Sequence, residues 1–195
     1  KEVVKTLGIH MENISKPVIC VEGPNDVNFL KNINNSIKEY KEIIDIDKIT
    51  IIPLQGANLI QWVEKDYLNN SNVKEFHIYD NDIVDYKKVV EAMDNVRVRG
   101  IITKKREMEN YIHPNLINEA FKEDIANCNN GSCYGCNDWN NCDIIKYIYP
   151  KAKMNETNFK KILNGNISKK ITKEHLEELD AYNEIKDWFV QIKDF

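Results

Sequence analysis

Four acidic residues in the first half of the chain have the spacing of a metal site. Glu22 directly ends one apolar run and Asp26 lies four residues later, while Asp80 and Asp82 directly follow another apolar run. In extended backbone, residues two positions apart point to the same side, so Asp80 and Asp82 can converge. Carboxylate oxygens are preferred ligands of Mg²⁺. We therefore expect one or two Mg²⁺ (or Mn²⁺) ions here, against the simpler alternative that these acids only cap turns.

Basic residues gather after the acidic ones. Arg97, Arg99, Lys104, Lys105 and Arg106 fall within ten positions. Phosphoryl transfer needs positive charge on the phosphate oxygens, and basic side chains beside a metal site would supply it. Arg97 and Arg99 alternate with valines, so we expect them to share one face of a strand, where they either lie at the surface or extend a groove for nucleic acid. The alternative is a solvated charge run.

The apolar pattern predicts the elements that must position these residues. Four short apolar runs alternate with helical patterns, which is typical of a parallel sheet covered by helices on both faces. The acids then fall at the carboxyl ends of the strands, where open parallel sheets bind ligands. The expected strands are 17–21, 49–54, 75–79 and 96–103, the expected helices between them are 24–33, 57–68 and 84–93, and the later helical patterns are 107–111, 115–125, 140–149 and 174–195.

Three segments resemble motifs of one known family. The string Val18–Leu30 resembles the first motif of topoisomerase-primase (TOPRIM) domains, and Tyr79–Asp82 resembles their DxD motif. The segment Thr103–Tyr111 is similar to the stretch after the fourth strand in OLD-family nucleases and related defence-system TOPRIM proteins. The resemblance covers residues 16–114 and implies an α/β, Rossmann-like TOPRIM fold with a sheet of about four strands.

The resemblance also implies roles for the acidic residues. Glu22 would be a metal ligand or the general acid/base, Asp80 and Asp82 would be metal ligands, and Asp26 would bind a second ion. Glu109 would join the metal cluster or hold the neighbouring basic residues in place. The implied activity is a metal-dependent endonuclease that hydrolyses phosphodiester bonds, as part of an antiviral defence or DNA repair system.

The same resemblance implies binding partners, and several alternative functions stay open. Lys104 or Lys105 would contact the scissile phosphate of a nucleic acid, with DNA favoured over RNA. OLD-family proteins usually carry an ABC-type ATPase, and because the chain has no P-loop pattern, we expect one upstream or on a partner chain. The rivals are another TOPRIM enzyme (a primase or an RNA-maturation nuclease), a non-catalytic TOPRIM docking module, and a receiver-like phosphoacceptor domain. The last fits poorly with Glu22 followed by Gly23.

Four cysteines lie close together in the second half of the chain. Cys128, Cys133, Cys136 and Cys142 have the spacing C-x4-C-x2-C-x5-C. Thiolates are good ligands for tetrahedral zinc, and clustered cysteines in a reducing compartment more often bind metal than form disulfides. A structural Zn²⁺ site is therefore expected, with free thiols as the main alternative and disulfides as the last.

Composition and length give the domain plan and the compartment. We expect a linker at 1–15, a TOPRIM catalytic domain at 16–113, and a helical extension at 114–195 that contains the Cys-rich loop 128–142. The chain has 195 residues, a net charge of −4 and 42% hydrophobic residues, and no run long enough to span a membrane. No signal peptide is recognisable, so a cytoplasmic location is expected. Homo-oligomerisation stays open.

Overall fold

The centre of the protein is a four-stranded parallel sheet. The computed structural model describes residues 16–55, 59–65, 68, 73–93, 96–126, 128–129, 132–133 and 138–195. The strand order is β2-β1-β3-β4, and every neighbouring pair is parallel. A parallel sheet needs crossover connections, and helices supply them here. The strands are β1 (Val18–Val21), β2 (Ile51–Pro53), β3 (Glu75–Tyr79) and β4 (Val98–Ile102).

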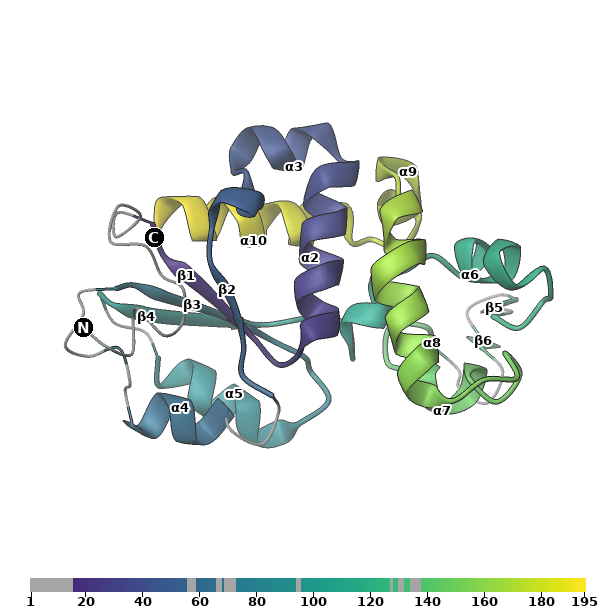
Figure 1. Ribbon diagram of the computed structural model, residues 1–195, viewed down its shortest axis with the longest axis horizontal. Helices are drawn as coiled ribbons and strands as arrows, with labels where there is room; N and C mark the ends of the chain where they lie inside the picture. The colour runs from purple at the N-terminus through teal and green to yellow at the C-terminus, as the bar shows by residue number, and fades with distance from the viewer. Residues whose placement is uncertain are drawn as a thin grey trace.

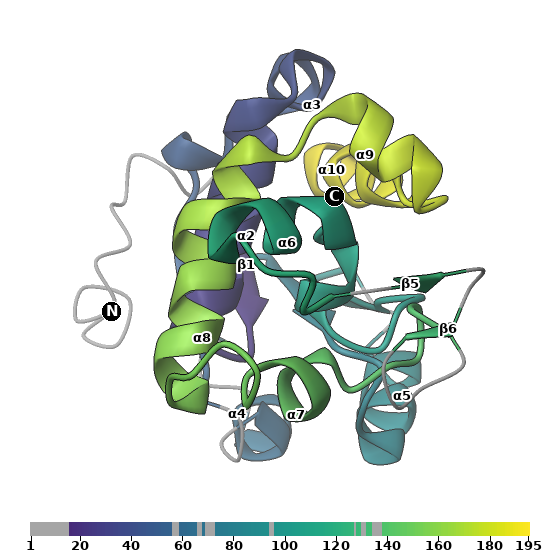
Figure 2. The ribbon, with the colours of Figure 1, turned by 90° about the vertical axis from the view of Figure 1, so that its right-hand side faces the viewer.

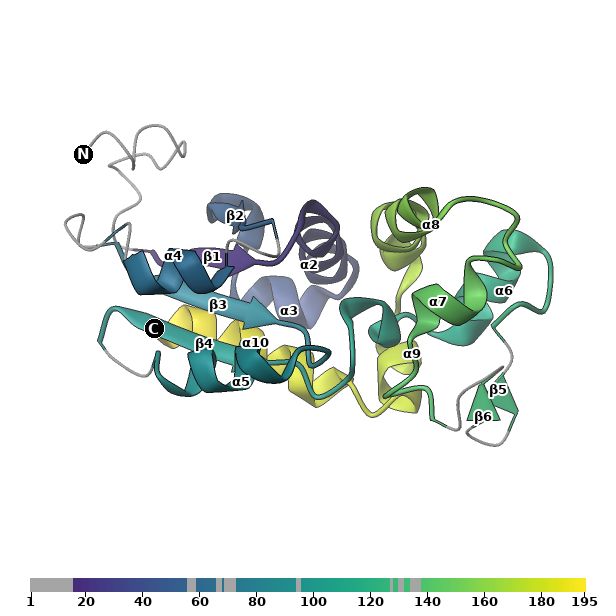
Figure 3. The same cartoon turned by 90° about the horizontal axis from the view of Figure 1, so that it is seen from below.

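Helices cover both faces of this sheet, as the apolar pattern predicts (Figures 1 and 3). One face packs against α2 (Pro24–Ser36) and α10 (Tyr182–Asp194), and the other against α4 (Leu59–Lys65) and α5 (Val84–Glu91). Side chains alternate between the faces, so Ile19 of β1 joins the first core and its neighbour Cys20 joins the second. The α/β class with a four-stranded parallel sheet is therefore confirmed.

Sequence signals explain where several of these elements begin. Pro24 occupies the first turn of α2, where its missing N–H costs nothing. The short helix α3 (Lys38–Ile43) and the 3₁₀ turn at Ile46–Lys48 then lead into β2. In β4, Gly100 allows close packing of α5 and the turn after it, because a Cβ there would lie 3.2 Å from Val90 Cγ1 and 2.9 Å from Met93 Sδ.

The second half of the chain forms helices beyond the carboxyl ends of the strands (Figures 1 and 2). The last helix, α10, then returns to pack on the sheet. One continuous hydrophobic core includes residues from both sides of position 113, so the expected catalytic domain and helical extension share their interior. The helices beyond the strand ends are α6 (Pro114–Phe121), α7 (Ile144–Ile148), α8 (Glu156–Ile162) and α9 (Lys173–Glu178), and a small hairpin pairs β5 (Cys128–Asn129) with β6 (Ser132–Cys133).

Two features of this region differ from the sequence-based expectation. The helix expected at 174–195 is two helices, α9 and α10, and Asp180 between them has φ 51, a left-handed conformation that ends a helix. The sequence pattern also missed α8 and the π-helical segment η6 (Leu163–Ile167) that continues it. Among the described residues, no helix combines the length and apolar character needed to cross a membrane.

Candidate metal centre at the strand ends

Six carboxylates and one lysine line a pocket of about 330 Å³ at the carboxyl ends of the central strands. All four acids expected at this edge are present, and the structure therefore brings together residues that lie up to 60 positions apart in the chain. Glu109, which the resemblance placed in the cluster, is there too. The seven charged residues are Glu22, Asp26, Asp80, Asp82, Glu107, Glu109 and Lys160.

Glu22 and Asp80 are held together by the ends of two adjacent strands. The backbone N–H of Asp80 donates a 2.9 Å hydrogen bond to Glu22 Oε1. Asp26 lies in the first turn of α2, where its Oδ2 accepts a 2.8 Å hydrogen bond from the Gly23 N–H. A carboxylate at a helix N-terminus is also favoured by the helix dipole. Local backbone geometry therefore fixes three of the predicted acids at one rim.

Glu107 and Glu109 reach the pocket from the turn after β4. Glu107 directly precedes the 3₁₀ helix η5 (Met108–Tyr111), and its backbone N–H donates to Asn110 Oδ1 at 2.9 Å. Glu109 is 3% exposed, and its Oε1 accepts a 2.8 Å hydrogen bond from Asn164 Nδ2. Asn164 belongs to the π-helical segment η6, a type of local distortion that is frequent at functional sites. Sequence reasoning missed Glu107 and Asn164.

Lys160 supplies the pocket's positive charge. It lies on α8, outside the sheet, and it lines the pocket together with the acids of the rim. Burial lowers the pKa of Lys160, but the facing carboxylates of Glu109 and Glu107 more than reverse this effect and raise it overall. Lys160 is therefore a charged ammonium facing the acids. The only sequence signal is the pair Lys160–Lys161, and nothing in the pattern shows which lysine faces the sheet.

Burial and, to a smaller extent, the neighbouring negative charges destabilise the ionised forms of the acids in this pocket. Burial is the main cause, and it raises the pKa of Glu22 and of Asp26 to about 7 each. Burial and the charge of Glu109 raise the pKa of Glu107 to about 8. The pKa of Asp80 is also raised, first by burial and then by Asp26 and Glu22. Lys160 alone does not neutralise the six carboxylates, so the pocket attracts further positive charge.

Two oxygen atoms in the pocket have no hydrogen-bond partner although they are buried. They are Asp80 Oδ1 and Glu107 Oε2. A buried carboxylate oxygen without a partner is costly, and a bound cation would satisfy it. Hard oxygen donors of this kind fit Mg²⁺ or Mn²⁺. The carboxylate oxygens are spread rather than clustered, since the described residues contain only one tight group of three potential ligands and that group lies elsewhere.

The structure does not place Lys104 and Lys105 where the resemblance implied. The Lys105 ammonium is buried among Asn140 Oδ1, the Leu179 carbonyl oxygen and the Tyr111 ring. The Lys104 side chain lines a separate groove beside α10. The backbone after β4 turns these side chains toward the C-terminal helices, and the lysine that lines the carboxylate pocket is Lys160.

Two of the three arginines lie away from the carboxylate pocket, and the third contacts acidic residues beside it. Arg97 lies at the opposite, amino end of the sheet and binds Glu75 Oε1 at 3.0 Å. Arg99 stacks over the Phe195 ring at 4.8 Å on the other face, so the two do not share a face as expected. Arg106 is half-buried, 3.8 Å from Glu107 Oε1 and 3.7 Å from an Asp143 oxygen. Only Arg106 is near the proposed site.

The cysteine cluster is described in part. Cys128 and Cys133 are register partners in the β5–β6 hairpin, and Cys136 lies outside the described residues. Cys142 is buried and disulfide-bonded. A disulfide sulfur does not serve as a zinc thiolate, so this state and the expected Zn²⁺ site exclude one another at Cys142. The zinc site stays a prediction.

The chain matches no protein-family model, no curated protein and no solved structure. The site described above therefore rests on the geometry of its own residues.

Proposed function

We propose that this chain is a metal-dependent endonuclease of the TOPRIM type, which hydrolyses phosphodiester bonds in nucleic acid. The observation that carries the proposal is the meeting of six carboxylates and Lys160 in one pocket at the carboxyl ends of a parallel sheet. Their positions agree with the resemblance at Glu22, Asp80 and Asp82. The α/β sheet is the architecture on which a Rossmann-like TOPRIM fold would be built.

The donor set supports a hard divalent ion. Glu22, Asp80 and Asp82 would hold one Mg²⁺, and Asp26 and the two glutamates after β4 would hold a second. When bound, such ions stabilise the charge on the attacking and leaving oxygens of a phosphodiester. The partnerless oxygen of Asp80 would become a ligand, which relieves the cost of burying it.

The protein's own groups have separate tasks in this proposal. The Lys160 ammonium would bind a non-bridging phosphate oxygen and hold the phosphate against the acidic rim. Asn164 would fix the Glu109 carboxylate through its 2.8 Å hydrogen bond. The Asp80 N–H would fix Glu22 in the same way. The substrate would thus be oriented before the reaction, which is a large part of catalysis by enzymes of this kind.

The proposal also includes a substrate, a partner and a cellular location for the enzyme. A nucleic-acid substrate, an ABC-type ATPase on the same or a partner chain, and a cytoplasmic location belong to it as predictions from the resemblance. The net charge of −4 does not oppose nucleic-acid binding, because two bound divalent ions would offset four of the six negative charges at the site.

Nicking of supercoiled plasmid DNA with Mg²⁺ or Mn²⁺ tests the proposal. We expect cleavage by the intact chain and a loss of at least about 100-fold in Glu22→Gln and Asp80→Asn. Asp85→Asn is the matched control, because Asp85 is an exposed aspartate on α5 outside the pocket and should leave cleavage unchanged. Equal cleavage by the intact chain and both site variants would show that the carboxylates do no catalysis.

A further inference from the structure

A second group of potential metal ligands lies inside the sheet, on the face covered by α4 and α5. Cys20 of β1 is the register partner of His77 of β3, and Glu75 is two residues before His77 on the same face. One ligand atom from each side chain lies within 4.8 Å of the other two. All three residues are almost completely buried. Within the described part of the chain, no other group of three is this close.

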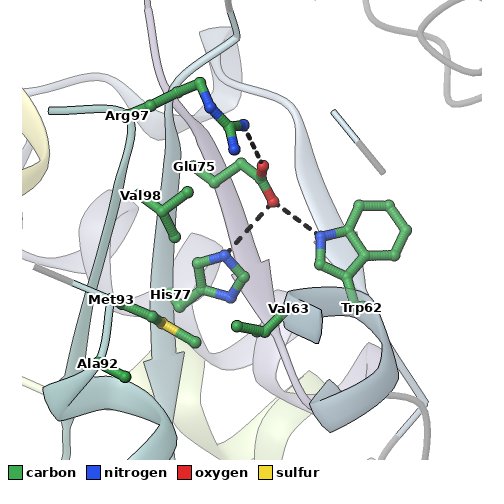
Figure 4. A pocket seen from close by; sticks show the side chains of 8 residues that line it. All are labelled: Trp62, Val63, Glu75, His77, Ala92, Met93, Arg97 and Val98. Carbon is green, nitrogen blue, oxygen red and sulfur yellow. Dashed lines mark hydrogen bonds and ion pairs between the residues drawn. The ribbon is translucent and has the colours of Figure 1, made fainter. Parts of the chain in front are cut away.

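Neighbouring groups fix the orientation of two of these side chains, Glu75 and His77 (Figure 4). Trp62 Nε1 donates to Glu75 Oε2 at 2.8 Å, and Arg97 donates to Glu75 Oε1 at 3.0 Å. His77 Nδ1 forms a hydrogen bond with the Tyr79 hydroxyl. Metal-binding histidines and carboxylates typically have such outer partners, which hold the ligating atom in place.

The remaining nitrogen of His77 is the atom that needs an explanation. Nε2 is fully buried, has no hydrogen-bond partner, and points toward Glu75 Oε2, 3.5 Å away (Figure 4). A buried nitrogen whose contact to the facing carboxylate is this long, with no hydrogen bond, is poorly satisfied. A cation between the imidazole and the carboxylate would satisfy it.

We propose that Cys20, Glu75 and His77 bind a borderline-soft divalent ion of the Zn²⁺ class. Zinc accepts thiolate, imidazole and carboxylate ligands together at about 2.0 to 2.3 Å, which needs only small side-chain shifts here. Binding releases the thiol proton of Cys20 to solvent. A cavity of about 180 Å³ adjoins Glu75 and His77 and leaves room for water in the fourth position.

This ion would join the two strands that present the acidic rim. Cys20 lies two residues before Glu22, and His77 lies three residues before Asp80. The site is chemically distinct from the rim because a thiolate and an imidazole select against Mg²⁺. The inference therefore does not depend on the proposed nuclease activity.

Cobalt binding followed by absorption spectroscopy tests the inference, because a thiolate–Co²⁺ bond gives a near-ultraviolet charge-transfer band. The background is the chain with Cys128, Cys133 and Cys136 changed to serine, which removes the expected zinc loop. We expect one Co²⁺ or Zn²⁺ per chain with this band. Cys20→Ser should abolish it, and Trp62→Phe, which removes only an outer partner, should weaken binding about 10- to 100-fold. Glu22→Gln should leave the band unchanged.

Two further measurements keep the test independent of folding defects. Circular dichroism of each variant shows whether it folds, and zinc content compared between the unaltered chain and Cys20→Ser should differ by one equivalent. X-ray absorption at the zinc edge of the loaded background should show one sulfur with nitrogen and oxygen ligands. The absence of the band and of retained zinc in the background would overturn the inference, and the group would then be a Glu75–Arg97 ion pair packed against Cys20 and His77.

Discussion

The ion-free protein should lose stability as the pH rises from 6 to 8, and Mg²⁺ should restore it. Burial raises the pKa of Glu22 and Asp26 to about 7 and that of Glu107 to about 8, above their ordinary values of 4.5, 3.8 and 4.5. The folded state therefore keeps protons that the unfolded chain has released. Since stability falls with pH wherever the folded state binds more protons, this contribution is fully present below about pH 4 and lost through pH 7 to 8.

The size of the effect follows from the pKa values. Each group should lose roughly 1 to 2 kcal/mol between pH 6 and pH 8. Because each ionised carboxylate raises the pKa of the others, the losses are not independent, and the total should be on the order of 3 kcal/mol. Mg²⁺ at about 100 times its dissociation constant should return about 2.7 kcal/mol. The gain should be larger at pH 8 than at pH 6, because protons compete with the ion.

Urea unfolding at pH 6, 7 and 8, with EDTA or with Mg²⁺, measures this directly. The control is the double variant Glu22→Gln and Asp26→Asn, which cannot ionise at these positions and should lose less stability over the same range. Burial lowers the pKa of His113, which acts in the opposite direction but is common to both proteins, so the difference between them isolates the carboxylates. Stability that is flat or rising with pH in EDTA, or that does not respond to Mg²⁺ at pH 8, would refute the reasoning.

Three further predictions concern single residues. Lys160→Met should lower kcat for DNA cleavage about 100- to 1,000-fold with little loss of stability. Lys105→Met should mainly lower the urea midpoint of unfolding, because it leaves buried hydrogen-bond acceptors unpaired. The reverse pattern would exclude Lys160 as the phosphate-binding cation. Asn164→Leu should weaken Mn²⁺ binding by releasing Glu109, measured by calorimetry, and unchanged affinity would contradict this role. Because Cys142 is in a disulfide, the protein denatured without reductant should titrate at most three of its five cysteines as thiols (5 − 2 = 3), whereas five thiols with bound zinc would favour the metal loop.

The first half of the fold could be predicted because its local signals agree with its tertiary structure. The apolar run 75–79 is both the expected strand and β3, and Pro24 begins α2 as expected. Parallel strands place their carboxyl ends at one edge, so the meeting of Glu22 and Asp80 followed from topology alone.

The rest of the site depends on contacts between distant segments. Lys160 lies 138 positions after Glu22 (160 − 22 = 138) on a helix that no clear pattern predicted, and only the packing of α8 decides that it faces the rim. The sequence made Lys105 a candidate for binding the scissile phosphate. In the fold, the turn after β4 buries its ammonium against the Leu179 carbonyl oxygen instead. A run of basic residues in a sequence does not show which way each side chain points in the fold.

The central claim is that the carboxylates at the strand ends bind a divalent cation. Its most direct test is an anomalous difference map from a crystal of this protein grown with Mn²⁺. We expect a manganese peak within ligand distance of both Glu22 and Asp80. A well-ordered map with manganese bound only elsewhere, or nowhere on the chain, would contradict it.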